Sequence, residues 1–377
     1  MALSNSSYGS VSNCRLYVDY IQYAKEIGYV DNFEIVNLDG DKKSVWDYNP
    51  ANVNTYSVIG NVDEIAFQIF FKNQSTPNTQ FSQFLSTMNY YGVLGTDLGL
   101  FGVDTPFAGS PDFQCEVFNY AEGGTATEWI HSHGTPIVGT TDAETSVGYV
   151  IKDIDAAFLG SDWISSFRIA LELPNEASAM IAEGTTIKVG SLIAGRYFDF
   201  PHSANLSMNI KRGYEGIKTK TTISGRSLSN ISYYKQPDWG DYPAWTHIDI
   251  ASLSGDVDPA KDLNFKPVAQ NGRREWKLKW SYIDKKDMFP KSSEGTMGGI
   301  YDNSNGDFDG FDEGGVHQGN IMGWLTTFTM GLNIPMLFQP DKTKQVFAKV
   351  KANQKSISIQ QSAPNLYTCK LKLTEVW

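Results

Sequence analysis

The sequence predicts a mainly β protein, built from antiparallel sandwich or jelly-roll-like domains with a few short helices. Aromatic residues make up 13% of the 377 residues, and aromatic side chains are enriched in strands. Apolar and polar residues alternate with a period of two, most clearly over residues 274–283. Short segments of this kind recur between turn residues such as Gly184, Gly213 and Gly225, which is typical of sandwiches rather than helical bundles.

The first predicted elements are a strand over residues 16–19 and a short helix over 20–27 that ends at Gly28. Two later helices are predicted where apolar residues recur at helical spacing, over residues 79–88 and 319–330. Between and after them, further strands are predicted over residues 65–71, 113–118, 147–151, 166–173, 186–193, 205–210, 217–223, 274–283 and 334–338.

Residues 345–377 are predicted to form a three-stranded antiparallel meander with a turn at 362–365. These strands lack enough partners by themselves, so we expect the N-terminal strand to join them. The predicted organisation is therefore a β-rich assembly domain of residues 1–60 plus 226–377, and a β-sandwich domain of residues 61–225.

Charge and cysteine content exclude several classes of protein. The formal net charge is −11, which disfavours nucleic-acid binding as the main role. The three cysteines, Cys14, Cys115 and Cys369, are odd in number and far apart, so we expect no disulfide framework and folding in a reducing cytoplasm. The sequence contains no secretion signal and no run of 18 apolar residues, so no membrane span is expected.

Two histidines form a candidate metal-binding pair. On a strand, His131 and His133 would point to the same face, and Glu128 lies close enough in sequence to be a third ligand. The alternative interpretation is a polar loop ahead of Gly134 and Pro136.

An acidic loop over residues 302–313 is a second candidate metal site. Crowded oxygen ligands on a glycine-bearing turn suit Ca²⁺. One alignment to an EF-hand places Val316 at the twelfth position and the other places Gly306 at the fifth, so neither satisfies that pattern. A calcium site of another kind and a solvated acidic loop both stay open; otherwise no cofactor is expected. The candidate ligands are Asp302, Asp307, Asp309, Asp312 and Glu313.

The loop over residues 237–245 concentrates aromatic rings between two prolines. Trp and Tyr carry a large share of binding energy, so these rings could stack on a sugar or anchor a protein interface. They could also fill the gap between two β-domains, and the sequence favours this structural role. The aromatic candidates in the loop and just before it are Trp239, Tyr242, Trp245, Tyr233 and Tyr234.

No pattern in the sequence indicates catalysis. The chain has no Gly-x-Ser-x-Gly segment with the Asp and His that would have to follow it, no phosphate-binding loop, and five scattered histidines. A pair of glycosidase carboxylates could exist among 42 acidic residues, but no pair is singled out. We therefore predict that the protein is not an enzyme.

Several segments taken together resemble structural proteins of the tail tip or baseplate of tailed bacteriophages, of the kind common in marine phages. They are RLYVDYIQY at 15–23, GRYFDFPHSANLSM at 195–208, GRREWKLKWSYI at 272–283, IPMLFQPD at 334–341 and LKLTEVW at 371–377. The resemblance covers both ends and the middle of the chain, and residues 30–190 carry little of it. Its segments are packing motifs, so it assigns no active-site residue.

This resemblance implies a virion component located in the tail and assembled in the cytoplasm of a host bacterium. Tail components form rings, so the expected partners are other copies of the chain and neighbouring tail proteins. The alternative function is a carbohydrate-binding sandwich that recognises host-surface glycans through the 237–245 loop. A free glycan-binding protein would be monomeric, which separates the two by oligomeric state.

Overall fold

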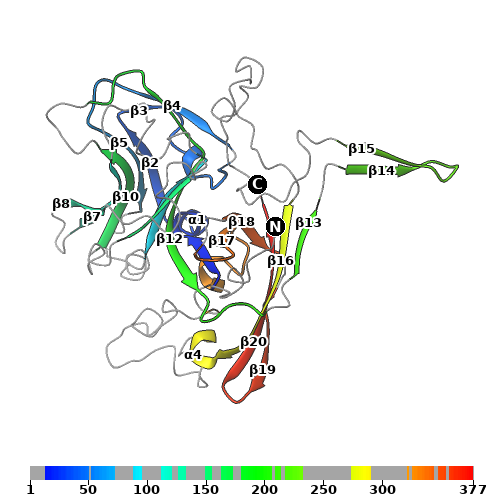
Figure 1. The fold of residues 1–377 in the computed structure, drawn as a ribbon. Helices are drawn as coiled ribbons and strands as arrows, with labels where there is room; N and C mark the ends of the chain where they lie inside the picture. Colours follow the sequence, from blue (N-terminus) through cyan, green and yellow to red (C-terminus); the bar gives the residue numbers. More distant parts are fainter. Residues whose placement is uncertain are drawn as a thin grey trace, which may run out of the picture.

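The fold is mainly β with antiparallel sheets, as the sequence predicts (Figure 1). The computed structural model describes residues 13–50, 52–72, 88–95, 112–120, 126–132, 149–154, 163–172, 180–205, 209–213, 217–231, 273–289, 321, 325–343, 347–353 and 356–376. Every strand pairing within these ranges is antiparallel.

The largest sheet has ten strands and contains both ends of the described chain. In spatial order it comprises β13 (Asn209–Gly213), β16 (Arg273–Asp284), β20 (Leu366–Glu375), β18 (Ala348–Ala352), β17 (Met336–Gln339), β1 (Arg15–Asp19), β12 (Ser191–Asp199), β6 (Tyr90–Leu94) and β9 (Tyr149–Asp153), with β19 (Ser358–Ala363) paired to β20. The N-terminal strand β1 is therefore central, between β17 and β12.

Three smaller β-structures complete the described fold. The five-stranded sheet comprises β2 (Val30–Val36), β5 (Glu64–Phe71), β10 (Trp163–Glu172), β7 (Asp112–Tyr120) and β8 (Ala126–Ser132). The three-stranded sheet comprises β11 (Thr186–Val189), β4 (Asn54–Val58) and β3 (Leu38–Asp39). A separate ribbon comprises β14 (Ile217–Thr221) and β15 (Ser227–Ile231).

The predicted first helix is present as α1 (Tyr20–Glu26). The Asp19 carboxylate caps it, because Oδ1 accepts hydrogen bonds from the backbone N–H groups of Ile21 at 2.8 Å and Gln22 at 3.4 Å. The helix stops before Gly28, whose φ of +75° is a conformation that glycine adopts without strain. The other short helices in the described ranges are η2 (Ser44–Trp46), α4 (Lys285–Met288) and α5 (Thr326–Phe328).

The predicted helix over 319–330 corresponds in its described part to α5. The predicted helix over 79–88 lies outside the described residues except for Met88, which is buried. Strands β2, β3, β4, β6, β8 and β15 had no counterpart among the predicted elements.

One predicted strand, over residues 186–193, is in fact two strands in two sheets. β11 pairs with β4, whereas β12 pairs with β1 and β6. The chain changes sheets at Gly190, where a Cβ atom would lie 2.3 Å from the carbonyl oxygen of Pro50. A glycine is needed there because the two backbones approach so closely.

The predicted C-terminal meander is wrong in its strand order. β18 pairs with residues 373–375 of β20, and β19 pairs with residues 366–370 along the same edge. β19 and β20 thus pair across a turn at residues 364–365, as predicted, whereas β18 pairs with β20 instead of with β19. The ten-residue length of β20 allows this, because two shorter strands fit along it.

The predicted domain boundaries at residues 60 and 225 do not follow the sheets. β12 belongs to the predicted middle domain, yet it pairs with the N-terminal strand over five residue pairs, from Arg15–Asp199 to Asp19–Gly195. The Arg15 guanidinium also donates to both carboxylate oxygens of Asp199, at 2.6 and 2.9 Å. The middle segment is thus part of the sheet that holds the two ends together.

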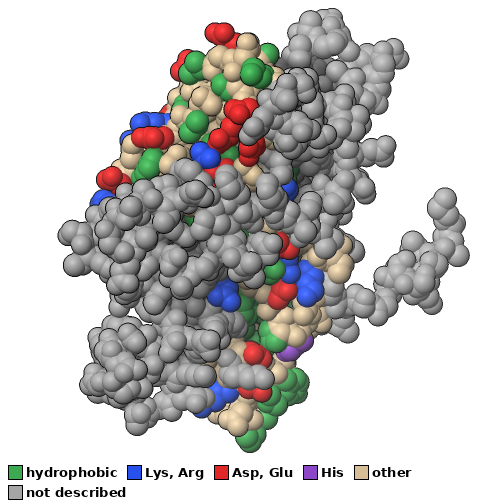
Figure 2. All heavy atoms as spheres, turned by 90° about the vertical axis from the view of Figure 1, so that its left-hand side faces the viewer, with side chains coloured by type: hydrophobic (Ala, Val, Ile, Leu, Met, Phe, Trp, Pro, Cys, Tyr) green, Lys and Arg blue, Asp and Glu red, His purple; other side chains and the backbone are tan. Residues whose placement is uncertain are grey.

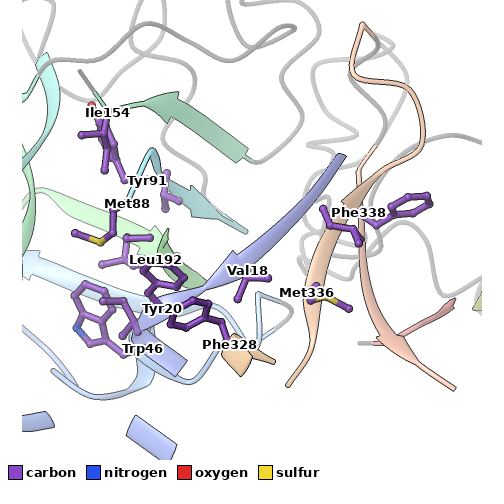
Figure 3. Packing of buried hydrophobic residues seen from close by; sticks show 14 of the residues in the cluster. Val18, Tyr20, Trp46, Met88, Tyr91, Ile154, Leu192, Phe328, Met336 and Phe338 are labelled. Carbon is purple, nitrogen blue, oxygen red and sulfur yellow. The ribbon is translucent and has the colours of Figure 1, made fainter. Parts of the chain in front are cut away.

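One apolar core joins the ten-stranded and five-stranded sheets. It contains Phe67 and Ile169 from the smaller sheet and Leu192 from the larger one. Figure 3 shows Tyr20 beside Phe328, whose ring centroids are 4.7 Å apart, with Trp46 in the same layer. The opposite face of the large sheet carries a second cluster around Tyr17, Tyr90, Ile193 and Leu337, so its centre is buried on both faces.

Candidate functional site

Most of the candidate residues named from the sequence lie outside the described residues. Only the backbone of His131 is described, within β8. The others outside the described ranges are His133, Tyr233, Tyr234, Trp239, Tyr242, Trp245, Asp302, Asp307, Asp309, Asp312 and Glu313.

The five-stranded sheet carries an unexpected row of polar residues. In register across the strands, Glu34 of β2 faces Gln68, Gln68 faces Arg168, and Arg168 faces Glu116. The backbone of Glu116 is in turn paired with that of His131. Residues directly opposite in an antiparallel sheet share a face. The alternate positions are core residues, including Phe67, Ile69, Phe167, Ile169, Cys115 and Val117.

Arg168 holds this row together through two carboxylates on neighbouring strands. Its Nε donates to Oε2 of Glu116, and its NH1 lies 3.1 Å from Oε1 of Glu64. The Glu116 side chain is fully buried. Gln114 extends the network, because its Nε2 donates to Oε1 of Glu116 at 2.8 Å and to Oε2 of Glu172 at 2.6 Å.

The cluster contains three glutamates, Glu64, Glu116 and Glu172, and one arginine, Arg168. Acidic groups therefore outnumber basic ones in it. Burial raises the pKa of the Glu64 carboxyl, and the charges of Glu116, Glu172 and Asp63 raise it further, while Arg168 lowers it. The arrangement can therefore take up a proton at Glu64. Within the described ranges, no three His, Cys, Asp or Glu side chains gather as a metal site would require.

A second polar site lies beside α1, where a pocket of about 320 Å³ opens. It is lined by Gln22, Asp47, Tyr48, Asn49, Pro335, Lys349 and Val376. The Lys349 ammonium is buried and donates to the backbone carbonyl of Tyr48. Burial lowers the pKa of Lys349 to about 8, although Asp47 and Asp19 raise it.

Asp19 is a buried carboxyl whose negative charge raises the pKa of Lys349. Its side chain is fully buried, and burial raises the pKa of its carboxyl to about 7, although the α1 hydrogen bonds and Lys25 lower it. Lys25 itself donates to the backbone carbonyl of Trp46. Burial thus moves the pKa of both the Asp19 carboxyl and the Lys349 amine toward neutral pH, and of these two groups Lys349 lines the pocket.

The third candidate is the β14–β15 ribbon, which projects away from the sheets (Figure 1). Its strands pair from Ile217–Ile231 to Thr221–Ser227. A tight turn closes it: the Gly225 N–H donates to the Thr222 carbonyl at 2.9 Å, and Gly225 has a φ of +78°.

The described side chains of this ribbon are exposed on both faces, except for the half-buried Thr222. Lys218 and Lys220 share one face with Leu228, because Lys220 lies directly opposite Leu228 in the ladder. Thr219, Thr221, Ser227 and Ser229 occupy the other face. At the tip, Ile223 is fully exposed. In its described part the ribbon therefore presents cations and apolar side chains to solvent.

The polar row and the ribbon contain residues that the candidate motifs missed. Gln114, Glu116 and Arg168 fall on predicted strands at alternating positions, and this spacing could have placed the first two on one face. It could not have paired β7 with β10, because pairing of distant strands leaves no local pattern. The ribbon was predicted only as one strand over residues 217–223.

The three cysteines, Cys14, Cys115 and Cys369, are all buried and form no disulfide. None of the helices in the described ranges has the length and hydropathy needed to cross a bilayer. In comparisons with known proteins, the chain matches no protein-family model, no curated protein and no solved structure.

Proposed function

We propose that this chain is a structural subunit of a tailed-bacteriophage particle, located in the tail tip or baseplate. It acts by assembling with copies of itself and by docking neighbouring tail proteins. The function needs no catalysis and no cofactor. The resemblance of its packing motifs to phage tail proteins gives the particle class, and the β14–β15 ribbon is the observation that carries the assembly role.

The ribbon supports assembly because its two strands pair with each other while their described side chains stay exposed. An isolated two-stranded ribbon is marginally stable in water, since it lacks a packed face. Here a defined turn and a full ladder hold β14 and β15 in register. A ribbon of this kind gains stability when a neighbouring protein covers it.

A second supporting feature is the strand β13, which ends the ten-stranded sheet among the described strands. Asn209, Ile210 and Lys211 are exposed along it. An exposed edge strand can pair with a strand of another chain, and an exposed isoleucine adds apolar contact. The ribbon follows β13 directly in sequence, so both features belong to one side of the molecule (Figure 1).

Oligomeric state tests the proposal. Size-exclusion chromatography with light scattering on the purified full chain should show a discrete oligomer whose population grows with concentration. Negative-stain electron microscopy of that peak should show rings or short stacks. A chain that stays monomeric at high concentration would contradict the assembly role.

A further inference from the structure

We infer that the β14–β15 ribbon is an arm that docks head-to-tail onto an acidic corner of a second copy of this chain. The acidic corner is formed by Asp63, Glu64, Glu172 and Glu183. This inference rests on the proposed function, because it names the partner surface for the same assembly.

The arm is basic in an acidic protein. It carries Lys218, Lys220 and Arg226 and no acidic residue, so it contributes +3 to a chain whose formal net charge is −11. The rest of the chain therefore carries −14. Within the described residues none of these three cations forms an ion pair. The arm and the remainder of the chain are thus complementary in charge, which favours contact between two copies.

The acidic corner is built by the end of the five-stranded sheet. Glu64 begins β5 and lies opposite Glu172, which ends β10. Asp63 precedes Glu64, and the backbone N–H of Glu183 donates to the side chain of Asn61 at 3.1 Å, which brings Glu183 to the same corner. Asp63 and Glu183 are exposed. Arg168 neutralises only part of this charge, through Glu64 and Glu116.

The arm and the acidic corner lie on opposite sides of one molecule, so an arm cannot reach its own corner. Figure 1 shows β14 and β15 projecting from one side, with β5 and β10 on the other. Figure 2 views the molecule from the β5–β10 side and shows several acidic side chains over its upper part, with a few Lys and Arg side chains among them. Contact between two different patches is heterologous, and repeating it closes a ring or extends a filament.

The two faces of the arm define which residues make the contact. Lys218, Lys220 and Leu228 share the cationic face, while the opposite face carries only threonine and serine hydroxyls in its described part. The cationic face would lie against the acidic corner, and exposed Ile223 at the tip adds apolar area. Neither contact requires either partner to refold.

Charge reversal on each surface tests the inference with the full chain. The arm-reversed variant is Lys218→Glu with Lys220→Glu, and the corner-reversed variant is Asp63→Lys with Glu183→Lys. Each should weaken self-association by about tenfold or more, because like charges then face each other. The control is Lys218→Arg with Lys220→Arg, which keeps the charge and should associate like the parent. Sedimentation velocity measures association in each case.

Mixing the two reversed variants provides the sharper test. The native arm of the corner-reversed chain matches the native corner of the arm-reversed chain, and the two reversed surfaces also match. The mixture should associate more strongly than either variant alone. All substituted positions are exposed, so circular dichroism and thermal unfolding should match those of the parent. The same mixture in 0.5 M salt should associate less, because exposed charges are screened.

The outcomes separate this inference from the proposed function. If the parent associates and the arm-reversed variant associates equally well, the docking inference is overturned while assembly by another surface stands. If the parent stays monomeric, both are overturned. A labelled DNA duplex serves as a competing probe: tight binding by the parent that is lost in the arm-reversed variant, without self-association, would assign the arm to nucleic acid and overturn the inference.

Discussion

The ring of Phe200 stacks on the indole of Trp280, with ring centroids 3.9 Å apart and ring planes 6° from parallel. Phe200 directly follows β12, whereas Trp280 lies in β16, far along the chain. Both side chains are fully buried. The stack therefore joins the middle of the chain to its C-terminal strands, and it accounts in part for a sheet that crosses both predicted domain boundaries.

The first prediction concerns this stack. Trp280→Ala should lower the free energy of unfolding by about 3–5 kcal/mol, because it leaves a large cavity beside Phe200. Trp276→Ala should have a similar effect, since its indole is buried against Phe338 with ring centroids 5.3 Å apart. Urea unfolding followed by circular dichroism measures both changes.

A matched control for the stack is Trp280→Phe, which keeps an aromatic ring. The buried Nε1 of Trp280 has no hydrogen-bond partner in the structure, so its loss removes no bond. The phenylalanine variant should therefore be clearly more stable than Trp280→Ala. Equal stability of the two variants would show that the stack contributes little.

The second prediction concerns the buried ion pair of Arg274 and Glu375. The guanidinium donates to Oε2 at 3.0 Å and Oε1 at 2.8 Å, and NH2 donates to the Phe347 carbonyl at 3.2 Å. Arg274→Met should cost about 3–5 kcal/mol, because it leaves a buried carboxylate without its cation. Thermal and urea unfolding measure the loss.

The double variant Arg274→Met with Glu375→Met tests that explanation. It removes both charges, so it should be more stable than the single Arg274→Met variant. If the double variant is instead the less stable of the two, the uncompensated charge is not the cause of the loss.

The third prediction is a pH dependence set by Glu64. Its pKa is raised in the folded protein, so its contribution to stability is present at low pH and is lost as the pH rises through that pKa. The Glu64→Gln variant lacks this titration. The ordinary pKa of a glutamate carboxyl is 4.5. As the pH rises from that value to neutral, the parent should thus lose stability relative to Glu64→Gln. Urea unfolding at a series of pH values measures the difference.

The exposed residue Glu183 offers the control for that experiment. Glu183→Gln also removes one negative charge but leaves the Arg168 cluster intact. A steeper change for Glu183→Gln than for Glu64→Gln would contradict the assignment of the titration to the cluster.

The fourth prediction concerns Asp19, which combines a helix cap with a raised pKa of about 7. The contribution of Asp19 to stability is fully present below pH 3.8, the ordinary pKa of an aspartate carboxyl. It is lost as the pH rises to about 7, the pKa of Asp19 in the folded protein. The Asp19→Asn variant keeps a capping oxygen but does not titrate. The parent should therefore lose stability relative to this variant between pH 4 and pH 7, measured by thermal unfolding.

Asp19→Ala separates the cap from the titration. This substitution removes the acceptor for the Ile21 and Gln22 N–H groups. Because neither substituted side chain titrates, Asp19→Ala should be less stable than Asp19→Asn at every pH, by about 1 kcal/mol from the loss of the cap. If Asp19→Ala is as stable as Asp19→Asn, the cap makes no net contribution.

Much of the local structure could be predicted from the sequence. Alternation placed β1, β5, β7, β10 and β16, and the Asp19–Gly28 segment predicted α1, because side-chain periodicity and turn residues act over a few positions. Sites confined to one loop could also be proposed, although the aromatic and acidic loops lie outside the described residues. Each of these predictions rests on a pattern within one short segment of the sequence.

From the sequence alone, antiparallel β-structure, the apolar face of β16 and the helix that follows β1 could be predicted. Which strands pair became clear only from the tertiary structure. Examples are the pairing of β12 with β1 and the ion pair between Arg168 and Glu116. Strand pairing joins residues far apart in the chain, so its free energy depends on packing across the whole core and leaves no pattern within either segment. The basic arm could be recognised only from the structure, which pairs β14 with β15 and leaves their described side chains exposed.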